Sequence, residues 1–487
     1  MSIWRVKPVS AFEADMKKSE LKRVLGKWSL TAIGIGAIIG GGIFVLTGTG
    51  AYYHAGPALA LSFIIAGVAC VFAALCYSEF ASILPVEGSA YAYAYGTIGE
   101  LFAWIIGWGL ILEYAMGSMT VAVSWSGYFN KLLKMFGLHL PDWLTSDPAS
   151  YTGQGFSMNL PAFCIVIFVI SILIRGTEGA AKANNLIVML KVSAVLFVIV
   201  AGAFYINTAN WHPFIPDATT IIDNAGKAHE AYGFKGVVSG AAAIFFAYVG
   251  FDAVSTQAGE AINPKKDVPF AIITSLLVCT FLYILVSLVL TGMMNFKDFN
   301  PIGNYPEAIK APVAYAFDIA GQAWAGYVVT IAATIGLISV LMVMIMGQSR
   351  IFLGMSKDGL IPPVFSKIHG LSGTPKTNLL ILGSVIAVIA AFTPINKLAD
   401  MTSFGTLFAF TMVCIAVWIL RRKQPELHRP FKVPFLPLIA ICGILINTYL
   451  MINLSIDAQM LSIGWLVIGV FIYFIYGKRK AKLNNPS

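Results

Sequence analysis

Apolar runs of about 20 residues recur along almost the whole chain, and no other feature constrains its fold as strongly. A helix of that length and composition crosses the hydrocarbon core of a bilayer. Of the 487 residues, 58% are hydrophobic and only 11% are charged, a balance that excludes a soluble enzyme. We therefore predict an all-α polytopic membrane protein with twelve transmembrane helices. The expected spans are residues 29–53, 57–84, 98–129, 158–175, 183–206, 236–260, 268–293, 322–355, 376–393, 396–420, 434–454 and 459–477.

The placement of basic residues predicts the orientation of the chain. It holds 32 Lys and Arg against 23 Asp and Glu, an excess that can attract nucleic acid. Most of these basic residues, however, fall in alternate connections between spans and at the two ends of the chain, as in the cytoplasmic segments of membrane proteins. We expect a multi-pass protein of the cell membrane with both termini in the cytoplasm, surrounded by lipid and without a nucleic-acid partner.

Two of the expected spans are interrupted near their middles. The first contains three consecutive glycines at 40–42, and the sixth contains the sequence FAYVGF at 246–251. Irregular backbone is tolerated at membrane depth only where it is buried in protein or lines a watery cavity. Discontinuous helices at corresponding places in two halves are typical of a transporter's central site. The sequence therefore predicts discontinuous helices 1 and 6 around a substrate site near the bilayer midplane.

The spacing of the two breaks predicts a repeat of five spans, and the odd number of spans inverts the second half. The expected order is a cytoplasmic N-terminal segment (1–28), a first inverted repeat (29–206), a second inverted repeat (236–420), two further helices (434–477) and a cytoplasmic tail (478–487). Two long outer connections, near 130–157 and 207–235, are expected to hold short helices or gates.

The glycines of the first break suit an anion. Gly40, Gly41 and Gly42 lack Cβ atoms, so a ligand can approach the main chain closely. A half-helix that begins near Gly42 and Ile43 would direct free amide groups and a positive dipole end into the gap. We predict that these four residues hold the carboxylate of an amino acid. The alternative is a run of small residues for tight helix packing.

The carbonyl groups at the ends of the two half-helices suit a cation. Where the helix unwinds, the carbonyls of Ile38 and Ile39 in span one, and of Phe246, Ala247 and Val249 in span six, lose their intrahelical partners. Such oxygens can bind an ammonium group. Together the two breaks would bind the carboxylate and the ammonium group that all α-amino acids share.

Four further residues are candidates for a side-chain pocket or gate: Glu113, Phe245, Tyr248 and Phe251. Glu113 lies near the centre of span three, where a carboxylate needs a partner or a proton. It could bind a cationic substrate, take part in proton coupling, or brace a neighbouring helix. The three aromatic residues could equally be core packing. Asp252, just past the second break, is expected to cap the new half-helix.

Lys191 lies in the middle of the fifth span, where an ammonium group is costly and ionisable residues are functional by default. Burial favours the neutral amine, so that protonation could accompany transport. The alternative is a permanently charged lysine that binds span-one carbonyls and only stabilises the fold. Ser339 of span eight is a candidate neighbour of this lysine.

Several stretches match one family in order along the chain: IIGGGIF (38–44), CYSEFASILP (76–85), GSAYAYAY (88–95), GWGLILEY (107–114), FAYVGFD (246–252), EAINPKKDVP (260–269) and RIFLGMSKDGL (350–360). In these motifs the chain resembles the amino acid, polyamine and organocation transporters, specifically the cationic amino acid transporter branch with its bacterial members. The resemblance implies a leucine-transporter-like inverted repeat and secondary transport of amino acids. It also implies that Lys191 occupies the place of a coupling cation. Glu79, Glu260 and Arg350 match family positions and could form an inner-gate network, or they could be solvated surface pairs of little energetic weight.

No catalytic, metal or cofactor constellation is recognisable. The glycines at 34–40 look like a dinucleotide fingerprint but have no preceding strand. Without a nucleotide-binding loop, the energy for transport must come from an ion gradient or from exchange. We therefore predict a proton-coupled symporter of amino acids, with neutral substrates favoured, and no enzymatic activity. The alternatives are a proton-independent exchanger or uniporter of Lys and Arg, or a membrane sensor or receptor of amino acids. A dimer or an accessory helix bound through spans eleven and twelve is left open.

Overall fold

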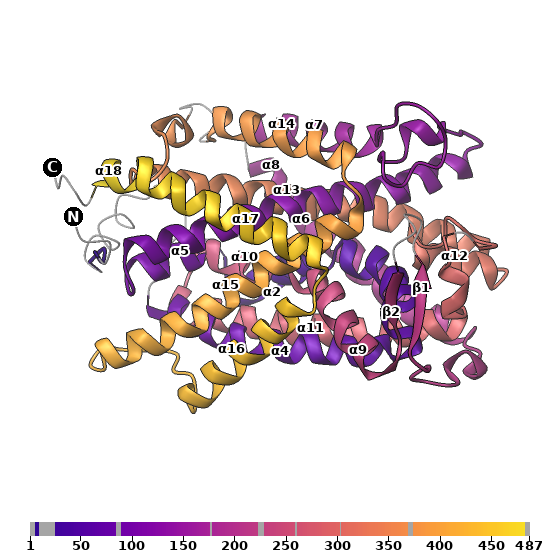
Figure 1. The fold of residues 1–487 in the computed structure, drawn as a ribbon, viewed down its shortest axis with the longest axis horizontal. Coiled ribbons are helices and arrows are strands. Elements are labelled where there is room, and N and C mark those ends of the chain that lie inside the picture. Colours follow the sequence, from indigo (N-terminus) through magenta and orange to yellow (C-terminus); the bar gives the residue numbers. More distant parts are fainter. Residues whose placement is uncertain are drawn as a thin grey trace.

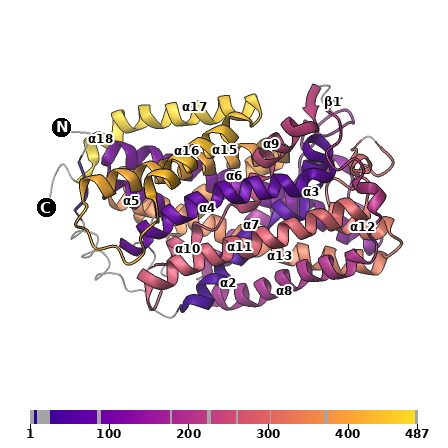
Figure 2. The same cartoon turned by 90° about the horizontal axis from the view of Figure 1, so that it is seen from below.

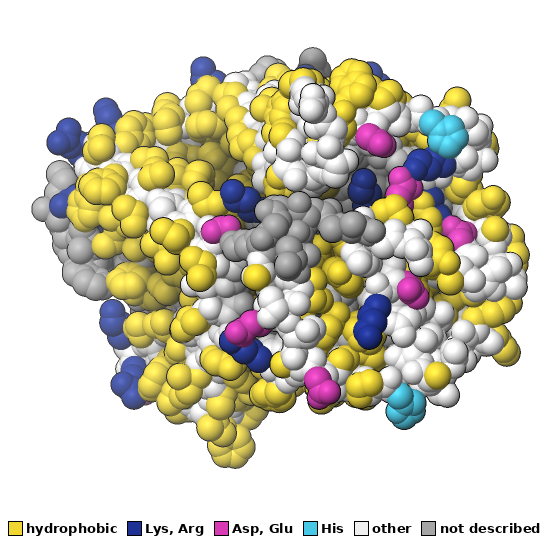
Figure 3. Space-filling model, turned by 45° about the vertical axis from the view of Figure 1, so that its right-hand side comes forward, with side chains coloured by type: hydrophobic (Ala, Val, Ile, Leu, Met, Phe, Trp, Pro, Cys, Tyr) yellow, Lys and Arg dark blue, Asp and Glu magenta, His cyan; other side chains and the backbone are white. Residues whose placement is uncertain are grey.

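The computed structural model describes residues 5–8, 25–83, 89–175, 178–222, 228–258, 261–301, 303–368 and 374–482. Most of this part of the chain is helical, and most helices run along the long axis of the molecule (Figure 1). Hydrophobic side chains cover much of the surface in Figure 3. Eight helices within the described residues are long and apolar enough to cross a membrane, and the prediction of a helical, polytopic membrane protein is confirmed. Three shorter apolar helices accompany them: Leu160–Arg175, Lys376–Phe392 and Leu436–Ile452.

The helices of the first predicted repeat follow the expected spans closely. The first span is divided into several short elements, and four helices follow it. The elements are α2 (Lys27–Ile38), η1 (Gly42–Leu46), α3 (Thr47–Gly50), η2 (Ala51–Ala55), α4 (Leu59–Ile83), α6 (Glu100–Met135), α7 (Leu160–Arg175) and α8 (Glu178–Ala203).

The second set has the same order, with a divided helix first and four helices after it. Its elements are α9 (Gly233–Ala243), η6 (Ile244–Tyr248), α10 (Ala253–Thr256), α11 (Pro264–Met293), α13 (Ala323–Lys357), α14 (Lys376–Phe392) and α15 (Ile395–Lys423). The chain then continues through α16 (Leu436–Ile452), α17 (Ile456–Ile472), η10 (Tyr473–Gly477) and α18 (Lys478–Lys480).

The two sets pack on each other in a reciprocal pattern. Helix α4 packs on α11, α6 on α13, and α7 on α14. In the first set α8 packs on α2 and reaches across to α11 and α13, and Figure 2 shows α2 and α8 together at one edge. In the second set α15 packs on α9 and reaches across to α4 and α6. The contacts that α8 makes with the second set therefore correspond to the contacts that α15 makes with the first set.

A short helix precedes the third long helix of each set. These helices, α5 (Ser89–Tyr95) and α12 (Pro312–Ile319), lie at opposite ends of the molecule (Figure 1). The sequence did not predict either of them, because each is too short and too mixed in composition to read as a span. Their positions at opposite ends are what an inverted arrangement of the two sets requires.

The two long connections that were predicted to lie on the outer side contain more than short helices. Each holds a 3₁₀ turn, η4 (Asp142–Leu144) and η5 (Thr208–Trp211), as expected. The second also forms an antiparallel hairpin of β1 (Thr219–Ile222) with β2 (Ala228–Ala231). The expectation of an all-α chain therefore misses one small hairpin, whose first strand, TTII, is rich in β-branched residues.

The described ends of the chain meet at one end of the molecule. Lys7 binds the carboxylate of Asp358 at 3.0 Å, and the amide of Lys482 donates to the Asp358 carbonyl at 2.9 Å. Asp358 caps the C-terminal end of α13. The predicted end segments, 1–28 and 478–487, otherwise lie largely outside the described residues.

Candidate functional site

The first break is buried in the middle of the molecule. Helix α2 ends at Ile38, and Ile39 leaves the helix with an extended ψ of 101°. The chain resumes a helical path at Gly41, and η1 begins at Gly42. All residues from Ile38 to Ile43 are buried. The predicted unwinding therefore occurs at the glycines, where the backbone can change direction at the lowest cost.

Lys191 lies beside this break and is 0% exposed. Its ammonium group binds the carbonyls of Gly36 and Ile39, at 3.1 Å for Ile39, which belong to the C-terminal end of α2. Its alkyl stem packs against Gly336 of α13, whose carbonyl accepts a hydrogen bond from Ser339 at 3.0 Å. Cations are favourable at helix C-termini, where carbonyls lack partners and the dipole is negative. Lys191 thus links α8, the end of α2 and α13.

The second break rests directly on the first. Val249 is extended, with ψ of 132°, and Gly250 has a φ of +116° that favours glycine. A Cβ atom at Gly250 would lie 2.9 Å from the carbonyl oxygen of Ala37, so the close approach requires glycine as well. A Cβ atom at Gly42 would overlap the Cα and Cβ atoms of Ala247. The two interrupted helices are therefore in van der Waals contact at their breaks.

The carbonyls that were expected to bind an ammonium group are close together. The hydroxyl of Tyr283, on α11, lies 2.7 Å from the carbonyl oxygen of Ile38 and 3.0 Å from that of Ala247. The carbonyl of Phe246 accepts from the amide of Val249 at 3.1 Å. Because a carbonyl oxygen has two lone pairs, each retains capacity for a second donor. Sequence reasoning missed Tyr283, since nothing local distinguishes it from a core tyrosine of a transmembrane helix.

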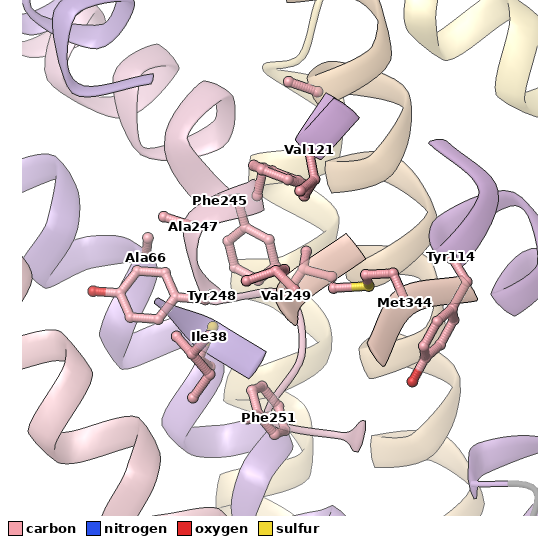
Figure 4. Packing of buried hydrophobic residues seen from close by; sticks show 14 of the residues in the cluster. Ile38, Ala66, Tyr114, Val121, Phe245, Ala247, Tyr248, Val249, Phe251 and Met344 are labelled. Atoms are coloured by element: carbon pink, nitrogen blue, oxygen red, sulfur yellow. The ribbon is translucent and has the colours of Figure 1, made fainter. Parts of the chain in front are cut away.

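The predicted pocket aromatics point in different directions. Tyr248 points toward Ala66 of α4, on the opposite side of the second break from Tyr114 (Figure 4), and its hydroxyl donates to the Phe63 carbonyl at 2.8 Å. Phe245 and Phe251 both pack against Phe410 of α15.

The ring of Phe246, by contrast, lies between the first break and α6. Cβ atoms built on Gly41 and Gly117 would lie 3.6 Å and 3.9 Å from it. Phe246 was expected to contribute only its carbonyl, but its ring also contacts both the first break at Gly41 and α6 at Gly117.

Glu113 and Asp252 lie near each other in the interior, each 1% exposed. The hydroxyl of Tyr114 donates to Asp252 at 2.8 Å. Glu113 packs its backbone against Gly405 of α15, with Thr406 also nearby. The expected cap is wrong. Asp252 precedes α10, but its backbone is helical rather than extended, so its carboxylate makes no cap hydrogen bond and faces Tyr114 instead.

The expected inner network is only partly as predicted. Glu79, at the end of α4, is 1% exposed and binds Arg421 and Arg429, and it also accepts from the amide of Val433 at 2.8 Å. These partners belong to α15 and to the connection after it, which the resemblance did not indicate. Glu260 lies outside the described residues.

Two ion pairs tie α6 to the α12 end of the molecule. Lys131 binds Asp318, and Lys134 binds Glu307. Tyr315 donates to Glu307 at 2.8 Å. Burial raises the pKa of Glu307, but the hydrogen bonds from Lys134 and Tyr315 outweigh it, and the pKa lies below its usual value. Sequence reasoning missed this network.

The described residues contain no group of three His, Cys, Asp or Glu side chains placed to hold a metal ion. What the arrangement offers instead is a pair of helix ends in contact, with amide donors, carbonyl acceptors and one buried lysine. A zwitterion has matching charges for such a site.

Comparison with known proteins gives a family match over most of the chain. The family described as amino acid permease matches residues 25–476. The branched-chain amino acid permease BcaP of Bacillus subtilis (strain 168) is 44% identical over 485 residues, 99% of both chains. A methylthioribose transporter of the same organism is 42% identical over 484 residues, 99% of this chain and 100% of that protein. The mitochondrial cationic amino acid transporter 3 of Arabidopsis thaliana is 37% identical over 87% of this chain and 65% of its own length.

Proposed function

Because the chain belongs to the amino acid permease family, we propose that it is a proton-coupled symporter of neutral L-amino acids that works by alternating access. Members of this family are membrane transporters and not enzymes. The observation that carries the proposal is the contact of two interrupted helices in the interior, beside a buried lysine. Such a contact places amides and carbonyls together at membrane depth, where they can bind both charged groups of an amino acid.

The transporter is a leucine-transporter-like inverted repeat of twelve spans, with residues 29–206 and 236–420 as its halves. The reciprocal packing of the two sets supports this architecture, as do the short helices α5 and α12 at opposite ends. Two halves related in this way can rock against each other around a central site. The end that carries Lys7 and Lys482 faces the cytoplasm of the cell membrane, by the excess of basic residues in the connections on that side.

The substrate carboxylate binds at the amides of Gly41, Gly42 and Ile43, and the ammonium group binds at the carbonyls of Ile38 and Ala247. Neutral side chains are favoured because Glu113 and Asp252 lie close to each other and to Tyr114, which leaves neither as a clear partner for a cationic side chain. A branched-chain amino acid permease among the relatives supports an apolar substrate.

Lys191 couples transport to protons. The charged amine holds the end of α2 through the Gly36 and Ile39 carbonyls. Loss of its proton removes two charge-assisted hydrogen bonds, which frees α2 to move relative to α8 and α13. Symport requires that a bound amino acid favour the same arrangement of the first break as the proton does, and the substrate site proposed at this break supplies that link.

A second candidate substrate is methylthioribose, since one relative of 42% identity carries that name. This sugar has hydroxyl groups and a thioether but no carboxylate or ammonium group. The contact of two helix ends with a buried lysine favours a zwitterion over a neutral sugar.

Counterflow into proteoliposomes distinguishes the candidates. Vesicles loaded with unlabelled leucine are expected to take up labelled leucine, isoleucine and valine faster than lysine, arginine or methylthioribose. A preference for lysine and arginine would favour the cationic exchanger, and a preference for methylthioribose would favour the sugar. Saturable binding without any flux would favour a sensor.

A further inference from the structure

One buried hydroxyl group beside the first break is unpaired within the part of the chain that the structure describes. Ser124, on α6, is 1% exposed, and its Oγ has no hydrogen-bond partner among the described residues. A buried hydroxyl without a hydrogen bond is a substantial cost to folding and needs an explanation.

The other hydroxyls of the same helix avoid this cost. Ser118 donates to the Tyr114 carbonyl at 2.7 Å, and Thr120 donates to the Met116 carbonyl at 2.8 Å. Both use the carbonyl four residues earlier, the usual partner of a serine or threonine within a helix. Ser126 donates to Asn159 at 2.6 Å. Ser124 has the same option through the Thr120 carbonyl and does not use it.

The Ser124 hydroxyl faces the backbone of the first break. A Cβ atom built on Gly41 would lie 2.6 Å from Ser124 Oγ and 3.1 Å from Ser124 Cβ. Gly41 directly precedes η1, whose first amides lack partners within the helix. The Ser124 hydroxyl and the positive end of the half-helix thus face the same place in the interior, beside Gly41. Their combined chemistry fits an anion, and a carboxylate has two oxygens to share between them.

We propose that Ser124 is a ligand of the substrate carboxylate, donating its hydroxyl to one carboxylate oxygen while the amides at Gly42 and Ile43 hold the other. This inference rests on the proposed function. Ser124 belongs to α6 and the amides belong to the divided first helix, so the carboxylate joins two helices that can move relative to each other. A substrate without a carboxylate cannot make this link.

The test compares Ser124→Ala and Ser124→Cys with the native protein and with Ser118→Ala. Ser118 is the matched control because its hydroxyl serves only its own helix. Counterflow gives KM and kcat for leucine, and leucinamide, which lacks the carboxylate, is used as a competitor. Losing a hydrogen bond to a charged group is expected to raise KM for leucine roughly tenfold or more in both Ser124 variants, with little change for Ser118→Ala.

Selectivity provides the second readout. Inhibition by leucinamide is expected to change little in either Ser124 variant, so the native preference for leucine over leucinamide shrinks by the same factor. Unchanged KM and unchanged selectivity in the Cys variant would overturn the proposal that Ser124 binds the carboxylate. The hydroxyl would then bind only a water molecule. Failure of the native protein to transport or bind any amino acid would instead overturn the proposed function.

Discussion

Both breaks interrupt a buried helix, but their surroundings differ. Around the first lie polar groups, namely Lys191 on the α2 carbonyls and the Ser124 hydroxyl facing Gly41. Around the second lie aromatic rings, with Phe245 and Phe251 packed on α15. The second break also has a buried acidic group beside it, because Asp252 follows Gly250 in the sequence and accepts a hydrogen bond from Tyr114 at 2.8 Å. In the proposed mechanism the first break binds the carboxylate and couples transport to the proton, while the second break supplies carbonyls and aromatic walls.

The largest expected effect comes from separating the two breaks. In Gly42→Ala the new methyl group would overlap the main chain of Ala247, which cannot move aside as a side chain can. We expect counterflow of leucine to fall roughly a hundredfold, an amount typical of a small displacement of reacting or binding groups.

Gly464→Ala is the control for this change. A Cβ atom there, on α17, meets nothing within 4 Å. Both variants are first checked by gel filtration for a single folded species. A Gly42→Ala protein that is well folded and transports at the native rate would show that the breaks need not touch.

A smaller effect is expected where the breaks share one hydroxyl. Tyr283→Phe removes the hydroxyl that lies within hydrogen-bond distance of the carbonyls of both Ile38 and Ala247. Loss of a neutral hydrogen bond of about 1 kcal/mol is expected to lower kcat/KM for leucine about fivefold. The measurement is concentration-dependent counterflow.

Tyr232→Phe is the matched variant, because its hydroxyl also donates to a carbonyl, that of Tyr52, away from the breaks. Equal losses of kcat/KM in both tyrosine variants would indicate a general effect on stability. They would contradict a role of the Ile38 and Ala247 carbonyls in transport.

The smallest effect is expected outside the breaks, at the ion pair between Lys134 and Glu307. Both side chains are 37% exposed, so Glu307→Gln should cost about 1 kcal/mol of stability or less at neutral pH. Because the Glu307 pKa is lowered in the fold, its contribution is present above the usual glutamate range and is lost as the pH falls through the lowered value.

Thermal unfolding of both proteins in detergent checks this prediction. The native and Gln proteins should differ slightly at pH 7 and become equal in strong acid. If Glu307→Gln lost as much leucine transport as Gly42→Ala, the result would contradict the expectation that the two breaks matter more for transport than this ion pair.

The sequence predicts the positions of the breaks because glycine and membrane depth are both visible in it. Three consecutive glycines in one apolar run, and Gly250 in another, have few structural explanations. Lys191 is visible for the same reason, since a charge in an apolar run is rare, and its contact with span-one carbonyls was one of the alternatives considered.

The residues that the sequence could not reveal are those whose significance depends on distant contacts. Ser124 and Tyr283 resemble ordinary residues of transmembrane helices until α6 and α11 are placed beside the breaks. Asp252 was misread because capping depends on its backbone angles, which are helical here. Local pattern predicts where a helix must break, whereas tertiary packing decides which side chains occupy the space around the break.

The central claim is that a proton on Lys191 couples the first break to transport. The most direct measurement is accumulation of labelled leucine in proteoliposomes, with and without an inward proton gradient, in sodium-free buffer, for the native protein and Lys191→Ala. We predict gradient-driven accumulation by the native protein and only equilibration by the variant, with counterflow retained. Equal accumulation by both proteins, or native uptake that ignores the gradient, would contradict the claim and assign Lys191 a purely structural role.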